Sequence, residues 1–225
     1  MKSKLLFLLL ILTVVFASCE KDNREAPSST ISGSITYGKQ PLSLRSNGVQ
    51  LELWQHGYQL FSKIPVYVNQ DGTFSARVFD GNYKLTLLKG NGPWADLTDS
   101  IDVTVKGSTQ VDVPVNPYFT INNETFQKNG TTIAATFNLQ KVDTSKALDL
   151  AKIYIGQTII TDENNNAANA QKAAADITDV SQPVTLSIDV PASLATKDYI
   201  YVRVGVKAAG VAELLYSPPQ MIMLK

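Results

Sequence analysis

Beyond residue 30, apolar and polar residues alternate in short runs that Gly, Pro, Asn and Asp separate. This period of two predicts half-buried β-strands, and the pattern contains no sustained helical period. In the first half of the chain the predicted strands fall at 31–37, 49–53, 66–68, 74–78, 83–87, 101–105 and 111–115. Seven strands within about 85 residues indicate a small β-sandwich.

The turn residues between these runs predict how the strands connect. Asp71-Gly72 and Asp80-Gly81 each lie between alternating runs, and Asp-Gly in that position favours a tight hairpin. The last two runs, 101–105 and 111–115, are predicted to form a further pair joined across Gly107.

The second half of the chain repeats the alternating pattern. Its predicted strands fall at 133–139, 153–155, 184–190, 200–206 and 221–224. Two prolines in the segment 114–117 cannot donate to a sheet, so this segment is predicted to be a linker. The stretch 162–175 is rich in Asn and Ala and is predicted to be a surface insertion with one helical turn after Ala167. The sequence therefore predicts an all-β protein with two sandwich domains in tandem, at 31–116 and 117–225.

Particular residues refine this fold. Ile31-Ser32-Gly33, Asp71-Gly72-Thr73-Phe74 and Gly81-Asn82-Tyr83-Lys84-Leu85 resemble the prealbumin-like, or carboxypeptidase-regulatory-like, sandwich. That resemblance implies a non-catalytic spacer or binding module. Tyr199 and Tyr201 lead into a long strand and resemble the tyrosine corner of immunoglobulin-like and fibronectin-like sandwiches.

The first 18 residues form a different kind of segment. Lys2 and Lys4 precede an apolar run at 5–16, and the small residues Ala17 and Ser18 follow it. This order is typical of a cleaved secretory signal peptide, and the run is short for a membrane span. We therefore expect residues 1–18 to be removed and residues 19–30 to form a tether.

Phe16-Ala17-Ser18-Cys19 resembles the lipobox of bacterial lipoproteins, although Phe16 stands where Leu is usual. The resemblance implies that Cys19 is acylated and anchors the chain in the outer membrane. The charged residues at 20–25 resemble the signal that sends Bacteroidetes lipoproteins to the cell exterior. The alternatives are an ordinary signal peptide, and an anchor on the periplasmic face.

Composition narrows the function. The chain has 20 basic and 20 acidic residues, and removal of Lys2 and Lys4 leaves 18 against 20, a net charge of −2. Without a basic stripe, nucleic acid is not an expected partner. His56 and Cys19 are the only histidine and cysteine, which leaves too few ligands for common zinc sites and no Cys/His dyad. We expect no cofactor, no metal and no catalysis, although a carboxylate pair would be compatible with the composition.

Three aromatic residues are candidate ligand contacts. Trp54 falls on the polar side of its predicted strand, and a flat apolar indole there suits the C–H face of a sugar ring. Tyr58 follows the nearby His56-Gly57 turn, and Trp94 follows the glycine-rich segment 90–93. The alternative is structural: Trp54 is covered by another part of the protein, and Trp94 closes one end of the sandwich.

Taken whole, the chain resembles a family of two-domain Bacteroidetes lipoproteins of unknown function. The resemblance rests on the export signal, on 71–74 with 83–85, on 90–94, and on Pro117-Tyr118-Phe119. Such genes often lie beside outer-membrane transporters and glycan-binding lipoproteins of the starch-utilisation type. The expected function is accessory glycan binding, or complex formation with a transporter-associated lipoprotein, in polysaccharide capture and import. The alternative is an adhesin-like lipoprotein that holds a protein partner.

Overall fold

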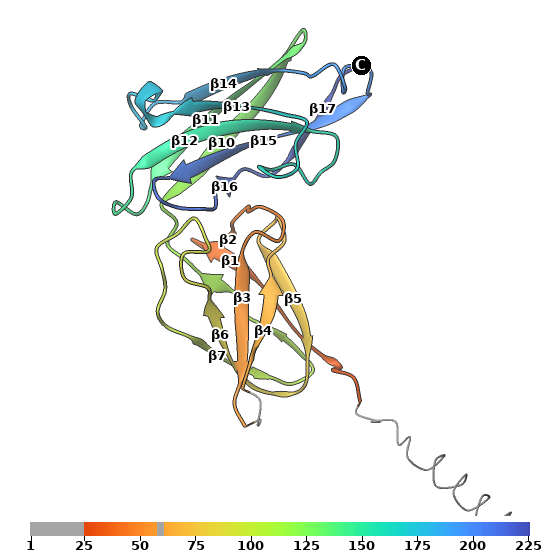
Figure 1. The fold of residues 1–225 in the computed structure, drawn as a ribbon, viewed down its shortest axis with the longest axis vertical. Coiled ribbons are helices and arrows are strands. Elements are labelled where there is room, and N and C mark those ends of the chain that lie inside the picture. Colours follow the sequence, from red (N-terminus) through yellow and green to blue (C-terminus); the bar gives the residue numbers. More distant parts are fainter. Residues whose placement is uncertain (1–24, 58–60) are drawn as a thin grey trace, which may run out of the picture.

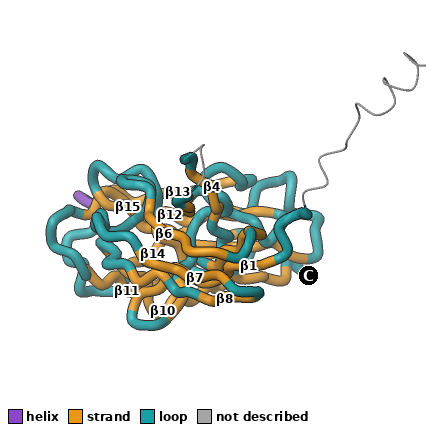
Figure 2. The backbone as a smooth tube through the Cα atoms, turned by 90° about the horizontal axis from the view of Figure 1, so that it is seen from below, coloured by secondary structure: helices purple, strands orange, loops and turns teal. Residues whose placement is uncertain are grey.

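The computed structural model describes residues 25–57 and 61–225, and these residues form two β-sandwiches stacked end to end (Figure 1). The predicted all-β class with two sandwich domains in tandem is confirmed. Over the described residues, the backbone consists of strands joined by loops, with one short 3-10 helix, η1 (Ala174–Asp176) (Figure 2). Within the described ranges, none of the helices is long and apolar enough to cross a bilayer.

The first domain has two facing sheets. One contains β1 (Ser29–Tyr37), β2 (Gln40–Pro41), β5 (Thr73–Val78), β8 (Ser108–Gln110) and β9 (Val113–Pro114). The other has the order β4 (Lys63–Tyr67), β3 (Gln50–Gln55), β6 (Gly81–Leu87), β7 (Ile101–Val105). Alternation sends Leu51 and Leu53 of β3 into the core between the sheets, where both are fully buried.

The predicted strands of this domain are present, and the predicted Asp71-Gly72 hairpin forms locally, but two other predicted connections are wrong. The Asp71-Gly72 turn closes a short hairpin, with an antiparallel bridge between Val68 and Phe74, before β4 and β5 continue in opposite sheets. The Asp80-Gly81 turn joins β5 to β6, which belong to opposite sheets. Likewise β7 pairs with β6, whereas β8 and β9 run parallel to β1 in the other sheet. An Asp-Gly pair predicts that the chain reverses direction, but it does not predict which sheet the next strand joins. Here the next strand joins the opposite sheet, so that the apolar faces of both sheets are buried against each other.

Close packing of the 108–114 segment on β1 depends on a glycine. A Cβ atom added at Gly33 would lie 1.7 Å from the main-chain oxygen of Val111. The amide of Val111 donates to the Ser32 oxygen at 2.8 Å in the same place. Only glycine allows the two backbones to approach this closely.

The second domain is also a two-sheet sandwich. Its first sheet is β10 (Phe119–Asn129), β11 (Thr132–Lys141) and β14 (Val184–Asp189). Its second sheet is β13 (Ala168–Ala173), β12 (Leu148–Gly156) and β15 (Tyr199–Ala208), which pairs with both β16 (Leu215–Tyr216) and β17 (Gln220–Met223).

Two local predictions for this domain are wrong. Residues 162–167 form the predicted loop and a helical turn, η1, follows at 174–176, but residues 168–173 between them form the edge strand β13, because pairing with β12 outweighs the helix preference of alanine. Tyr199 and Tyr201 pack edge to face at 5.9 Å, and among the described residues neither hydroxyl has a hydrogen-bond partner. A bond of the tyrosine-corner kind is made instead in the first domain, where the Tyr83 hydroxyl donates to the Phe79 oxygen at 2.9 Å.

The domains meet through specific polar contacts. Arg203 of β15 is fully buried and donates from Nη2 to the main-chain oxygen of Leu44 at 2.8 Å. The amide of Tyr216 donates to the oxygen of Ser43 at 3.0 Å, and Arg45 forms a bidentate ion pair with Glu213. These bonds span the junction at several points and fix the relative position of the two domains.

Candidate ligand-binding surface

An aromatic cluster of Trp54, His56 and Phe61 lies beside the outer face of the β4-β3-β6-β7 sheet. The centroid of the Phe61 ring lies 5.1 Å from that of Trp54 and 4.6 Å from that of His56. Trp54 is half-buried, His56 is exposed, and Phe61 is 51% exposed. The cluster therefore presents aromatic rings to solvent.

Sheet register surrounds Trp54 with charged residues. Trp54 lies opposite Lys63 on β4 and opposite Lys84 on β6. Lys84 in turn lies opposite Asp102 on β7, and their side chains form an ion pair at 2.5 Å. All these side chains point outward because residues opposite one another in register share a face of the sheet.

Glu52 holds the indole in place. Its Oε2 accepts a hydrogen bond from Trp54 Nε1 at 3.2 Å, and its Oε1 accepts one from Lys63 Nζ at 2.6 Å. Glu52 is only 9% exposed although it lies on the outer face, because its neighbours cover it. A tryptophan with a bonded Nε1 and a packed ring loses little conformational freedom when a ligand binds.

The site residues predicted from the sequence differ in where the structure places them. Trp54 lies on the outer face with Glu52, as its alternation in the sequence predicts. Tyr58 and Cys19 lie outside the described residues. Phe61 and the Glu52–Trp54 bond were not predicted. The only sequence signal for Phe61 is that a strand returning after His56-Gly57 would place residues near 61 opposite residues 54–56.

Trp94 is a correction: it is 4% exposed and cannot be a ligand platform. Its ring packs on Gly92, where an added Cβ would lie 2.2 Å from the indole. Backbone bonds fix the loop, since the Ala95 amide donates to the Asn116 oxygen and the Tyr118 amide to the Pro93 oxygen. Trp94 therefore closes the sandwich beside the linker, the structural alternative stated for it above.

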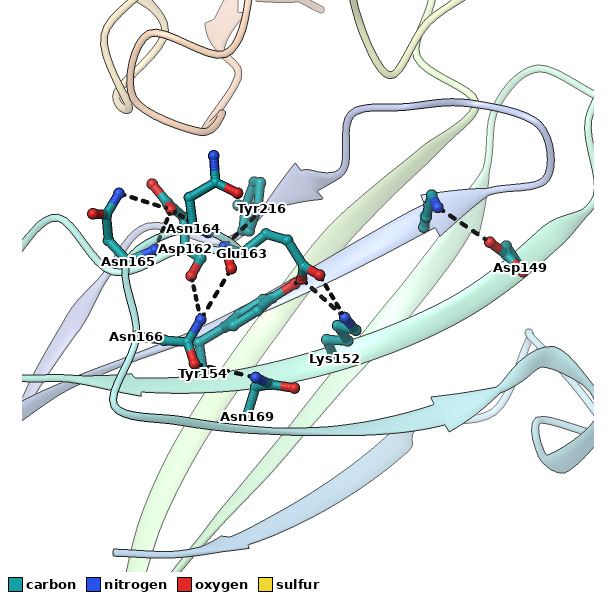
Figure 3. A network of polar contacts seen from close by, with 11 residues as sticks. Asp149, Lys152, Tyr154, Asp162, Glu163, Asn164, Asn165, Asn166, Asn169 and Tyr216 are labelled. Atoms are coloured by element: carbon teal, nitrogen blue, oxygen red, sulfur yellow. Dashed lines mark hydrogen bonds and ion pairs between the residues drawn. The ribbon is translucent and has the colours of Figure 1, made fainter. Parts of the chain in front are cut away.

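A polar network in the second domain serves a structural purpose (Figure 3). The Tyr154 hydroxyl donates to Glu163 Oε2 at 2.6 Å, and Lys152 Nζ donates to Glu163 Oε1 at 2.8 Å. Burial raises the pKa of Tyr154 further above its usual range. Partial burial acts to raise the pKa of Glu163, but the bonds from Lys152 and Tyr154 outweigh it and leave that pKa below the usual range. The network thus holds a fixed ion pair and a neutral phenol.

Asparagines organise the loop next to this network. Asp162 Oδ1 accepts from the amides of Asn164 and Asn165 at 2.9 and 3.0 Å. Asn166 Nδ2 donates to the main-chain oxygens of Asp162 and Glu163. The asparagines between 162 and 167 therefore bond to their own loop, and no group of three or more His, Cys, Asp or Glu suited to a metal occurs among the described residues.

Comparison with known proteins gives the family. Residues 29–116 match the N-terminal domain of a protein of unknown function, DUF3823, and residues 119–221 match the DUF3823 C-terminal domain. Among curated proteins, none matches the chain.

Three crystal structures share the whole architecture. A DUF3823 protein from Bacteroides ovatus is 37% identical with a TM-score of 0.81, over 88% of this chain and 100% of the other. One from Parabacteroides merdae is 36% identical with a TM-score of 0.80, over 89% and 100%. A Bacteroides uniformis protein provisionally described as carbohydrate binding is 22% identical with a TM-score of 0.73, over 88% and 100%, and this likeness concerns the fold alone. The chain therefore belongs to the DUF3823 family of two-domain proteins.

Proposed function

We propose that this protein is a non-catalytic lipoprotein of the outer cell surface that binds glycan through the aromatic cluster. The observation that carries the proposal is Trp54, held by its Nε1 bond to Glu52 on the outside of the sheet and packed against the exposed Phe61. An aromatic face packs against the C–H face of a pyranose, and the rim of lysines and carboxylates supplies hydrogen bonds to sugar hydroxyls. This role makes the protein an accessory to polysaccharide capture and import.

The binding test uses the mature chain beginning at Glu20 and calorimetric titration with neutral and acidic oligosaccharides. Trp54→Ala is expected to weaken binding about ten-fold, equivalent to about 1.4 kcal/mol. Phe79→Ala is the matched control, because Phe79 is an exposed aromatic residue outside the cluster. No heat with any sugar, or equal binding by Trp54→Ala and the original chain, would contradict glycan binding at this surface.

Anchoring at Cys19 is part of the same proposal. The export signal and the single cysteine support it, since several acyl chains on one residue give stable membrane attachment. Cys19→Ala should move the protein from the outer-membrane fraction to the soluble or unprocessed fraction. Protease digestion of intact cells should remove the anchored protein if it faces the exterior; a protected protein would place it on the periplasmic side.

A protein partner is the second candidate function. Tyr199 lies opposite Met223 and Tyr201 opposite Met221 on the β15–β17 pair. Met221 and Met223 are more than half exposed, and exposed Tyr and Met are typical of protein interfaces. Met221→Lys with Met223→Lys should abolish co-purification with a transporter-associated lipoprotein if this surface binds one. Unchanged co-purification would argue against that surface.

A further inference from the structure

A cleft of about 350 Å³ opens at the domain junction, between the β1–β2 hairpin and the start of β10. This volume lies within the usual range for small-molecule sites, which often occur between domains. The first domain contributes Tyr37, Gln40 and Ser43 to its wall, and the second contributes Thr120, Asn122 and Gln140. Neither domain alone forms the cleft.

The wall of the cleft is formed by uncharged residues. Among the described residues that line the cleft, none is Asp, Glu, Lys, Arg or His. The side-chain amides of Gln40 and Gln140 are exposed, and within 25–57 and 61–225 they have no hydrogen-bond partner. Amides and hydroxyls both donate and accept, which matches sugar hydroxyl groups, whereas an ionic ligand would find no counter-charge.

Backbone features shape the wall. Gly38 and Lys39 both have positive φ, 57° and 68°, which gives the β1–β2 hairpin its tight turn. On the opposite wall, the β10–β11 register shifts between Asn122 and Thr125, and Asn123 has a φ of 54°. Such bulges redirect side chains, and they occur often beside binding sites.

Bonds across the domain junction hold the two walls of the cleft in place. The bond from the Tyr216 amide to the Ser43 oxygen joins the two walls, and Arg203 fixes the same junction. Asn122 Nδ2 donates to Thr120 Oγ1 at 3.2 Å, which orients the amide within the wall. A ligand would therefore need little rearrangement of the protein.

From these observations we propose that the interdomain cleft binds a single ring of a neutral saccharide. The ring packs against Tyr37, and the amides of Gln40, Asn122 and Gln140 bind its hydroxyls. This site is separate from the aromatic cluster: β3 extends from the domain junction toward the far end of the first domain (Figure 1), and Trp54 lies near the end of that strand. The proposal does not depend on glycan binding at Trp54.

The test is saturation-transfer NMR on the mature chain with the methyl glycosides of glucose, galactose and mannose, and with N-acetylglucosamine. Gln140→Leu removes the side-chain amide and leaves an apolar side chain that is one atom shorter. Gln127→Leu is the matched control, because Gln127 is exposed on β10 but does not line the cleft. We expect at least one probe to bind in the millimolar range, and about ten-fold weaker binding by Gln140→Leu.

Each outcome decides the proposal. Binding weakened by Gln140→Leu and retained by both Gln127→Leu and Trp54→Ala supports the cleft. Binding lost only in Trp54→Ala overturns the cleft and supports the aromatic cluster. No binding of any probe up to tens of millimolar overturns the cleft as a monosaccharide site, and leaves the oligosaccharide titration of the Trp54 surface as a separate result.

Discussion

Arg203 of the second domain donates to the main-chain oxygen of Leu44 in the first domain at 2.8 Å. The guanidinium also donates from Nε to the Ser217 oxygen at 2.6 Å and lies 4.4 Å from the centre of the Tyr216 ring. Burial lowers the pKa of Arg203 to about 10, so the group keeps its charge at neutral pH. Asp162, which is also fully buried, supplies nearby negative charge.

Arg203→Met should lower the free energy of unfolding by about 3–5 kcal/mol, because it leaves several main-chain carbonyls without a donor and removes positive charge near the buried Asp162 carboxylate. Urea denaturation of the mature chain measures the change. Arg77→Met is the control, since Arg77 is exposed and should change stability by no more than about 0.5 kcal/mol. Equal stabilities of the two variants would show that Arg203 does not hold the junction.

Trp94→Ala should lower the free energy of unfolding by about 3–5 kcal/mol, the usual result when a buried indole is removed from a core. Phe61→Ala removes a half-exposed ring and should lower the free energy of unfolding by much less than Trp94→Ala does. Thermal unfolding followed by circular dichroism compares the two. A small effect at Trp94 would contradict its place in the core.

The two tryptophans should differ in their access to a fluorescence quencher. Trp94→Phe leaves only the half-buried Trp54, and Trp54→Phe leaves only the buried Trp94. We expect acrylamide to quench the protein that retains Trp54 several-fold more efficiently. Similar quenching of both proteins would mean that Trp54 is covered and unavailable to a ligand.

Glu163 should make the free energy of unfolding depend on pH. Its pKa in the folded protein is below the usual range, so its stabilising contribution is present above the unfolded pKa and is lost as pH falls through the folded pKa. Between pH 6 and pH 3 the original protein should therefore lose more stability than Glu163→Gln. Glu124→Gln is the control, because Glu124 has no hydrogen bond or ion pair through its carboxylate among the described residues; it should follow the original curve.

The strands of the first domain could be predicted because each has one buried and one exposed face. Leu51 and Leu53 against Glu52 and Trp54 form such an alternation, and β3 follows it. The connections could not be predicted, because Asp80-Gly81 specifies a turn but not which sheet receives the next strand. Strand β13 was missed since its alternating residues are small or polar, and only its pairing with β12 defines it.

The candidate site was predictable in part for a related reason. Alternation places Trp54 on the outer face, whereas the Phe61 contact depends on how the chain returns to β4. Trp94 and Trp54 look alike in sequence, each beside polar or glycine-rich residues. Their difference arises from tertiary contacts, because Gly92 leaves room for the indole of Trp94 against its own loop.

The bonds of Arg203 to the first domain end on main-chain oxygens, those of Leu44 and Gln70. Every amino acid carries such an oxygen, so exchanges at positions 44 and 70 that preserve the backbone path leave the acceptors unchanged. An exchange at position 203 removes the donors themselves. At this part of the junction, the second domain must therefore keep the chemical identity of one residue, Arg203. The first domain needs only to keep the path of its backbone.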